Sequence, residues 1–509
     1  MFTAITEDLT ILTVAFGVLV LAWGFFRARP YGKLGILAWL QSVMLMLPWL
    51  LVFGLAASGV MVNLVVVLLM LVASTAGYIV LGSRVRSLRQ EATLARRASA
   101  IAQSQQPESN TANAEGADSS ASNTTSPPSP TNVIEEPDVV PIPAEDLKAI
   151  QGIFGIDTFF ATETIPYQEG AIFRGNLRAE ADDAYAKLAE NLKERLSDRY
   201  RLFLVEYQDG KPVVIVLPSS RDPQPMTIPQ KILAVILILV TISTCLESAG
   251  LMLGFDFYAE PSRVAETIPF AAGIITILTV HEIAHWVLAK RYQVRLSLPF
   301  FIPTLQLGSF GALTRIESVL PNRNVLFDIA FAGPAAGGIL SFGMLMTGLL
   351  LSHKGSLFQL PSQFFQGSIL VGTLARVVLS ESLQDPIVDV NPLVVLGWLG
   401  LVITALNLLP AGQLDGGRIV QSIYGRKIAA RTTIGTLILL GLASLVNQLA
   451  LYWAILILFL QRDLERPCSN ELTEPDDARA ALGLLALFLM VVTLLPLTPS
   501  LAGRLGIGM

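Results

Sequence analysis

The sequence predicts a polytopic α-helical membrane protein with about ten transmembrane helices. Charged residues make up only 15% of the 509 residues, and hydrophobic residues make up 52%. A soluble chain of this length needs more charge to cover its surface. Several uninterrupted apolar runs also reach the roughly 20 helical residues that cross a lipid bilayer. The net charge of -5 gives no indication of a nucleic-acid partner.

Residues 1–97 are predicted to form a three-helix membrane segment. Its apolar runs are roughly Leu9–Phe26, Leu34–Phe53 and Val60–Gly82. Basic residues follow the first run and, in a larger group, the third: Arg27, Arg29 and Lys33, then Arg84, Arg86, Arg89, Arg96 and Arg97. Because basic residues favour the cytoplasmic side, we expect the amino terminus outside and the chain entering the cytoplasm after the third helix.

A soluble region is expected next. Residues 98–143 are rich in Ser, Thr, Asn, Ala and Pro, which bury too little apolar surface to fold, so a disordered linker is predicted. Residues 144–230 are predicted to be a small soluble α+β module with a short first helix, a strand near Ala171–Phe173 and an amphipathic helix near 181–199. Two strand-like runs then flank Asp209-Gly210, a pair typical of a tight hairpin turn.

The chain then returns to the membrane, with a core at 231–461 and a C-terminal loop and final helix at 462–509. Helices are expected near Ile232–Leu253, Ile268–Lys290, Val325–Ser352, Pro392–Ile419, Thr432–Val446, Leu449–Leu460 and Ala480–Leu497. Their predicted cytoplasmic ends carry basic residues, among them Arg295, Arg315, Arg323, Arg418, Arg426 and Arg462. One long tilted helix across Asn447-Gln448 is the alternative to two short ones. It would place Arg462 on the side of the membrane opposite the cytoplasm, where basic residues are disfavoured. Cys245 in an apolar run and Cys468 in a polar loop argue against a disulfide framework.

The segment His281-Glu282-Ile283-Ala284-His285 has the H-E-x-x-H spacing. On a helix, residues four apart share one face, so both imidazoles can bind one cation. Glu282 lies about 100° around the helix and can take a proton from a metal-bound water. Zinc suits two imidazoles and one carboxylate, with a fourth position open to water. The alternative is a polar cluster that seals helix packing without a metal, although each ionisable side chain in a membrane helix costs at least ~2.5 kcal/mol.

A third ligand is expected from a second polar stretch, NLLPAGQLDGG at 407–417. Asp415 lies in this stretch, and the predicted topology puts it at the same depth as His281. Pro410 and the glycines break or kink the helix, and irregular backbone within a membrane is tolerated only where protein or water covers it. His353 is expected to be a solvated loop residue at the outer end of its helix, whereas His285 lies toward the cytoplasmic end. The alternative for Asp415 is a solvated aspartate at an ordinary helix end.

These residues resemble the site-2 protease family of intramembrane zinc metalloproteases. The resemblance rests on HEIAH followed by NLLPAGQLDGG, with Gly333-Pro334 in FAGPAAGG between them, and it covers about 231–426. The segment Arg295–Ile316 resembles the membrane-dipping β-hairpin of that family. Gly175-Asn176-Leu177-Arg178 matches the GNLR motif of a branch found in cyanobacteria and chloroplasts, and a tight turn between strand and helix is the alternative for these four residues.

The resemblance implies a zinc metalloendopeptidase that carries out regulated intramembrane proteolysis. It implies that His281, His285 and Asp415 bind Zn²⁺. It also implies that Glu282 is the general base and that Asn407 holds the substrate carbonyl or its oxyanion. The expected substrates are membrane-anchored proteins, cut within or near a transmembrane segment at an active site near the cytoplasmic side. The hairpin is expected either to add a strand to the unwound substrate or to plug the helix bundle.

Two other functions are alternatives. A metal-ion transporter would carry ionisable residues at several depths along its helices, whereas here the polar residues concentrate at two places predicted to share one level. A catalytically silent membrane scaffold that keeps the fold is the second alternative. The expected location is a prokaryotic plasma membrane or a thylakoid membrane, and no oligomeric state is predicted.

Overall fold

The structure is a computed structural model that describes residues 21–29, 32–57, 66–67, 69–70, 73–78, 80–82, 84–85 and 142–507, apart from 168, 208, 209 and 446. The chain forms two compact units, residues 1–139 with 438–458 and residues 140–437 with 459–509. Most of the predicted helix Leu9–Phe26 and ten residues of the predicted helix Val60–Gly82 lie outside the described residues. The predicted linker lies outside them as well, up to residue 141.

The first unit contains a long apolar helix, α2 (Gly32–Ala57), which corresponds to the predicted helix Leu34–Phe53. The indole of Trp39 donates a hydrogen bond of 2.8 Å to the Leu21 carbonyl. The same ring packs edge-on against Phe25, with centroids 4.9 Å apart. A short helix before α2 is thereby tied to the start of α2.

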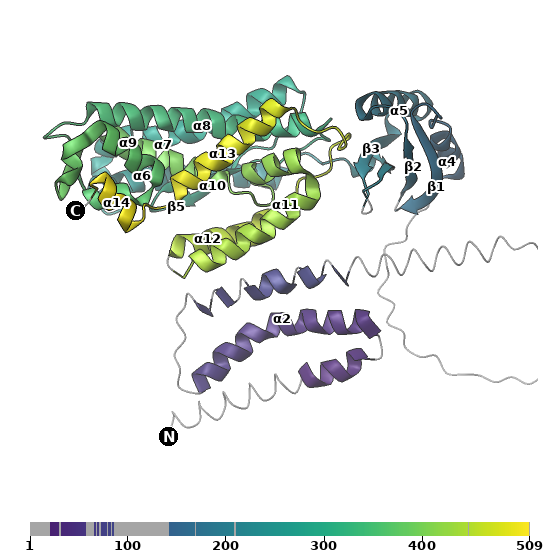
Figure 1. Ribbon diagram of the computed structural model, residues 1–509, viewed down its shortest axis with the longest axis horizontal. Helices are drawn as coiled ribbons and strands as arrows, with labels where there is room; N and C mark the ends of the chain where they lie inside the picture. The colour runs from purple at the N-terminus through teal and green to yellow at the C-terminus, as the bar shows by residue number, and fades with distance from the viewer. Residues whose placement is uncertain are drawn as a thin grey trace, which may run out of the picture. The chain divides into compact units, whose positions relative to one another are not determined.

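The soluble module has a four-stranded antiparallel sheet in the order β1-β2-β4-β3. Its elements are α4 (Ala144–Gln151), β1 (Phe159–Tyr167), β2 (Gly170–Leu177), α5 (Ala181–Leu196), β3 (Tyr200–Glu206) and β4 (Pro212–Pro218). The two helices pack on one face of the sheet, where Leu188 and Leu192 of α5 meet Phe173, Leu204 and Val216 (Figure 1). Strand β1 was not predicted, whereas the other elements were.

Gly175, Asn176 and Leu177 lie in β2 and Arg178 directly follows it, so the alternative of a tight turn at these residues is wrong. Gly175 belongs to β2 and pairs with Ala161 of β1. A Cβ atom on Gly175 would lie 2.1 Å from the carbonyl oxygen of Phe160. Glycine is needed at this position because the backbone of β1 approaches too closely for any side chain.

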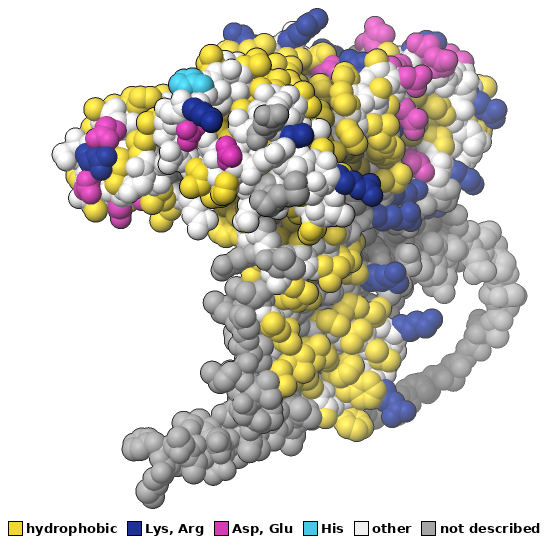
Figure 2. Space-filling view, turned by 60° about the vertical axis from the view of Figure 1, so that its left-hand side comes forward, with side chains coloured by type: hydrophobic (Ala, Val, Ile, Leu, Met, Phe, Trp, Pro, Cys, Tyr) yellow, Lys and Arg dark blue, Asp and Glu magenta, His cyan; other side chains and the backbone are white. Residues whose placement is uncertain are grey.

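Four helices among the described residues are long and apolar enough to cross a membrane. They span Ile228–Met252 (α6), Pro261–Arg291 (a short turn and α7, Val264–Arg291), Arg323–Leu351 (α8) and Asp477–Leu494 (α13). Helices α7 and α8 pack against a shorter apolar helix, α10 (Pro392–Asn407), and α13 covers α10 (Figure 1). On the face drawn in Figure 2, hydrophobic side chains form broad patches between groups of charged ones. Such patches suit contact with lipid.

The predicted helix Pro392–Ile419 is two helices. Helix α10 ends at Asn407, residues 408–414 are irregular, and α11 (Asp415–Ala443) begins at Asp415. Gly412 has φ +50°, and a Cβ there would lie 1.4 Å from the Gln461 carbonyl oxygen. Glycine is therefore needed at this position, because the backbone at Gln461 approaches too closely for a side chain.

Helix α11 includes most of the predicted helix Thr432–Val446, with an interruption at Gly425, where φ is +78°. It ends at Ala443, and a separate helix, α12 (Gln448–Leu456), begins five residues later. The side chain of Asn447 caps α12 by accepting a hydrogen bond of 3.0 Å from Leu449 N. The prediction of two helices rather than one is confirmed.

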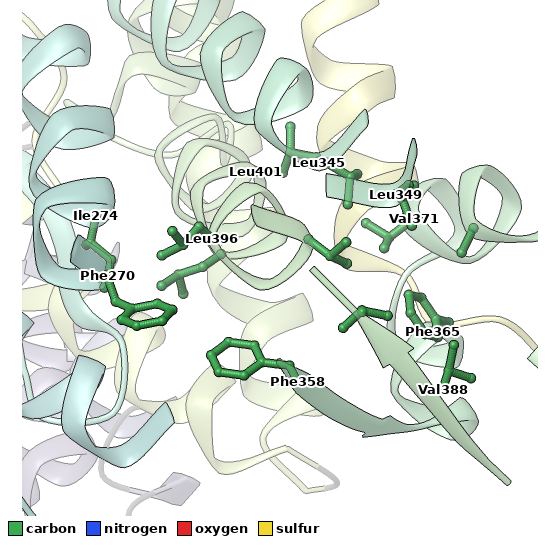
Figure 3. Close-up of a cluster of buried hydrophobic side chains, with 14 of the residues drawn as sticks. Phe270, Ile274, Leu345, Leu349, Phe358, Phe365, Val371, Val388, Leu396 and Leu401 are labelled. Carbon is green, nitrogen blue, oxygen red and sulfur yellow. The ribbon is translucent and has the colours of Figure 1, made fainter. Parts of the chain in front are cut away.

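A compact insertion between α8 and α10 was not predicted. It consists of β7 (Phe358–Pro361), α9 (Ile369–Leu379) and β8 (Ile387–Val390), and the C-terminal helix α14 (Pro499–Leu505) packs beside it. Phe358 stacks on Phe270 of α7, with centroids 5.5 Å apart, and Leu345 and Leu349 of α8 complete this apolar cluster (Figure 3). The cluster fixes one end of α7 and α8.

The predicted β-hairpin is present as β5 (Phe300–Thr304) and β6 (Gly308–Leu313). Helix α6 holds its tip, where Thr244 Oγ1 donates 2.6 Å to the Gly308 carbonyl and Ser248 Oγ donates 3.2 Å to the Gln306 carbonyl. The turn uses Gly308 at φ +79°, a conformation that favours glycine. The hairpin is thus held rigidly against the membrane helices.

The loop between α12 and α13 is ordered against the soluble module. Leu204 of β3 donates to the Ser469 carbonyl at 2.7 Å and accepts from Glu471 N at 2.9 Å. Cys468 lies in this loop, as the sequence indicated, but its side chain is fully buried. Burial raises the pKa of the Cys468 thiol well above its ordinary value, so this thiol stays protonated.

Candidate metal centre

Helix α7 presents both histidines of the H-E-x-x-H motif toward the interior. His281 and His285 are buried, and their rings meet edge to face with centroids 4.8 Å apart. The two Nε2 atoms are 3.1 Å apart. The four-residue helical spacing therefore converges both imidazoles on one point, as the sequence predicted.

Asp415 reaches the same point from the first residue of α11. Its Oδ2 lies 3.2 Å from His281 Nε2 and 3.4 Å from His285 Nε2. His281, His285 and Asp415 are the only group of three or more His, Cys, Asp or Glu in the described part of the chain that could hold a metal ion. Because helix α10 ends at Asn407, Asp415 can point inward from the start of a new helix.

The three donor–donor distances fit a tetrahedral metal site. Zinc binds imidazole nitrogen and carboxylate oxygen at about 2.0–2.2 Å, so two ligands at tetrahedral angles lie about 3.3 Å apart. The observed distances of 3.1, 3.2 and 3.4 Å match this value. Two imidazoles and a carboxylate are also a donor set that zinc prefers.

Helix α8 supports the histidines from the other side. Nδ1 of His285 lies 2.7 Å from the Ile329 carbonyl oxygen, so it carries the proton and Nε2 keeps its lone pair for a metal. A Cβ on Gly333 would lie 2.2 Å from His285 Nε2 and 2.7 Å from His281 Nε2. The glycine before Pro334 is thus explained by the close approach of α8 to the donor atoms.

Glu282 and Asn407 lie next to the three donors. Together with His285 and Asp415 they line a cavity of about 20 Å³, which has room for one water. Asn407 is buried and donates 3.1 Å to the Ile403 carbonyl of its own helix. The structure therefore brings all five predicted site residues together, and it places His353 among exposed residues beyond the end of α8.

Three residues beside this cavity were not singled out from the sequence. Thr314 Oγ1 donates 2.6 Å to Glu282 Oε2. Arg418, counted among the basic residues at cytoplasmic ends, is buried and pairs with buried Glu465 at 3.0 Å. The sequence could have indicated Arg418, because it follows Asp415 by three residues and both therefore lie on one helix face.

Comparison with known proteins gives two family matches. Residues 269–447, which include all five predicted site residues, match Peptidase family M50. Residues 148–225 match the EGY3 middle domain, so the soluble module has relatives of its own. No solved structure matches the chain.

Several curated plant proteins are similar over most of the chain. The Probable zinc metalloprotease EGY1, chloroplastic, of Arabidopsis thaliana is 38% identical over 403 residues, which are 72% of this chain and 73% of that protein. The protein of the same description from Oryza sativa subsp. japonica is 36% identical over 408 residues, 72% of this chain and 70% of that protein. The Probable zinc metallopeptidase EGY3, chloroplastic, of Arabidopsis thaliana is 32% identical over 380 residues, 69% of this chain and 66% of that protein. The chain therefore belongs to peptidase family M50.

Proposed function

We propose that this member of peptidase family M50 is an intramembrane zinc metalloprotease that hydrolyses peptide bonds within or near the transmembrane segments of membrane-anchored proteins. The family and the relatives described as zinc metalloproteases support the enzyme class and the zinc dependence. The observation that carries the proposal for the site is the convergence of two imidazoles and a carboxylate within 3.4 Å of one another, next to Glu282.

In this proposal His281, His285 and Asp415 bind Zn²⁺ and leave a fourth position for water. Zinc held by these three residues would supply Lewis-acid polarisation of the scissile carbonyl and would make water a stronger nucleophile at neutral pH. The fit is supported by the donor–donor distances and by the His285 tautomer that the Ile329 carbonyl selects.

Glu282 acts as general base and then as general acid. Its carboxylate takes a proton from the water that attacks the carbonyl carbon, and it returns that proton to the amine as the C–N bond breaks. Asn407 holds the substrate carbonyl or its oxyanion through its side-chain amide. Support comes from the shared cavity that Glu282 and Asn407 line.

The hairpin is proposed to hold the unwound substrate as an added strand. Strand β6 is the nearer strand to the cavity, because a Cβ on Gly311 would lie 2.5 Å from Asn407 Nδ2, and because the chain after β6 brings Thr314 to Glu282. An extended peptide added to a strand there would place its backbone beside the general base. The plug remains the alternative, and a shortened hairpin that leaves cleavage unchanged would favour it.

The proposed membrane arrangement has about ten transmembrane helices, an outside amino terminus and an active site near the cytoplasmic side. The proposed division is 1–97, 98–143, 144–230, 231–461 and 462–509, as the sequence predicts. The four long apolar helices support a multi-pass membrane protein. The relatives described as chloroplastic are compatible with a thylakoid membrane, and a prokaryotic plasma membrane is the alternative.

The test replaces Glu282 with Gln and compares membrane-protein fragments from cells that express either form. A co-expressed single-span protein that the wild type cuts should remain intact with Glu282→Gln, while the purified variant still contains zinc. Glu266→Gln is the matched control, because Glu266 is an exposed carboxylate at the start of the same helix. Undiminished cleavage by Glu282→Gln would remove Glu282 from the mechanism.

A further inference from the structure

The carboxylate of Glu282 is anchored by one side chain from outside its own helix. Thr314, at the end of β6, donates a hydrogen bond of 2.6 Å from Oγ1 to Glu282 Oε2. Both side chains line the cavity that also contains His285 and Asp415. One carboxylate oxygen is therefore held by the hairpin, and Oε1 is left for other partners.

Thr314 is in turn held by a buried arginine. The Arg418 guanidinium donates 2.9 Å from one terminal nitrogen to the Thr314 carbonyl oxygen. The side chains of Arg418 and Glu465 are each 8% exposed, and their closest approach is 3.0 Å. A buried arginine needs such a partner, since an unpaired buried charge is strongly destabilising.

Glu465 is itself fixed from the side of α11. Its carbonyl oxygen accepts a hydrogen bond of 3.1 Å from Gln421 Nε2 and a second one from Arg426. The pair of Arg418 and Glu465 therefore has little freedom to move. A continuous series of contacts runs from α11 through Glu465, Arg418 and Thr314 to Glu282.

We infer that Thr314 is a positioning residue for Glu282, and that the buried Arg418–Glu465 pair holds Thr314 in place. The inference rests on the proposed role of Glu282 as general base. A base must present its oxygen within hydrogen-bonding reach of the attacking water, and a side chain with free rotation spends little time in that geometry. Thr314 fixes the rotation by occupying Oε2, so that Oε1 is presented to the cavity.

The test measures cleavage of a single-span membrane protein by purified Thr314→Val, Thr314→Ser and wild-type enzyme. Valine keeps the shape and the β-branch of threonine but cannot donate a hydrogen bond. We expect Thr314→Val to lower kcat about tenfold, with KM and zinc content as in wild type. Thr314→Ser keeps the hydroxyl and should stay within about twofold of wild type.

The matched control is Thr276→Val. Thr276 lies on α7, and its hydroxyl donates only to the Ala272 carbonyl of the same helix. Its loss should leave kcat unchanged. If Thr314→Val melts well below wild type, the comparison moves to Thr314→Ala against Thr314→Ser, which differ by the hydroxyl alone.

A double-mutant cycle tests the second half of the inference. Glu465→Gln should lower kcat in the wild-type background and cause no further loss in the Thr314→Val background, because both changes release the same carboxylate. If the two losses multiply, Arg418 and Glu465 do not act through Thr314, and that half is overturned.

The outcomes separate the inference from the proposed function. If Glu282→Gln still cleaves, the proposed base is wrong. If Glu282→Gln is inactive but Thr314→Val has wild-type kcat, only the positioning role is overturned. A fall in zinc content or a rise in KM with unchanged kcat would likewise contradict it, since a positioning residue for the base changes the chemical step.

Discussion

Two aspartates, Asp415 and Asp328, each join side chains from separate helices, and their surroundings differ. Asp328 of α8 accepts hydrogen bonds of 2.7 and 2.8 Å from Arg479 of α13 and one of 2.5 Å from Tyr292, just after α7. Asp415 of α11 faces the Nε2 atoms of His281 and His285 instead.

The Asp328 carboxylate is paired with a guanidinium, whereas the Asp415 carboxylate faces two imidazoles. Arg479 brings the opposite charge to Asp328. At Asp415 the nearest guanidinium, that of Arg418, is 4.0 Å away and is engaged by Glu465. His285 donates a hydrogen bond from Nδ1 to the Ile329 carbonyl, so the lone pair of Nε2 faces the Asp415 carboxylate. A bound cation would balance this arrangement, so the comparison favours the proposed metal site at Asp415 over a second structural cluster.

The largest expected effect comes from exchanging the two aspartates for asparagine, one at a time. Asp415→Asn should lose most of its zinc and lower cleavage by more than about 100-fold, since even a residue that only orients a ligand contributes about 10- to 100-fold. Asp328→Asn should keep its zinc and its kcat. Metal analysis of both purified variants tests this difference in zinc content. Zinc loss in Asp328→Asn alone would mean that Asp328, and not Asp415, belongs to the metal site.

The second prediction concerns the helix that backs the histidines. Gly333→Ala should lower cleavage about 100-fold, because the added methyl displaces imidazoles that must be placed to within about 1 Å. Gly338→Ala is the control, since its Cβ would lie 3.6 Å from Thr404, an ordinary contact. Zinc content and cleavage are measured for both, and equal activity of the two variants would contradict the close approach.

A smaller effect is expected from the structural cluster. Arg479→Gln should lower the free energy of unfolding by about 1–2 kcal/mol, because Arg479 is 27% exposed and part of its charge is solvated. The folded variant should keep the kcat of wild type. Thermal melts in detergent, read beside a cleavage assay, test both statements, and a loss of zinc would argue against a purely structural role.

The smallest effect is expected at the surface pair of Lys427 and Glu206, 3.0 Å apart and each more than half exposed. Lys427→Ala should change the free energy of unfolding by less than about 1 kcal/mol, because exposed pairs gain little in water. A thermal melt in detergent measures this change. A large destabilisation would mean that this pair contributes more to the docking of the soluble module than its exposure indicates.

The metal centre could be predicted because its signals are local. His281 and His285 need only the helical repeat, and Asp415 stands out as an acid in an apolar region interrupted by Pro410 and glycines. Thr314 and Glu465 could not be found in this way, and the spacing from Asp415 gives the helix face of Arg418 but not its partners. Each is an ordinary residue in the sequence, and their contacts join segments that only the folded chain brings together.

The fold, too, could be predicted where local sequence decides it and not where remote segments do. Long apolar runs predict α6, α7, α8 and α13 because length and composition decide them. Strand β1, FFATETIPY, was missed because its alternation is broken by a bulge and a proline. The predicted helix Pro392–Ile419 is divided in the region of Pro410 and the glycines, where the sequence indicated a break or kink. The close approach of the Gln461 backbone to Gly412 could not be predicted, because Gln461 is remote in sequence.

The contact of Leu204 with Ser469 and Glu471 joins a part of the chain that is synthesised early to one that is synthesised late. The soluble module leaves the ribosome early, since synthesis runs from the amino terminus. Strand β3 therefore lacks its contact with Ser469 and Glu471 until the loop between α12 and α13 has been made. Asp415 and Glu465 are also made late. The proposed site is therefore incomplete during most of translation, and cleavage is expected only from a nearly finished chain.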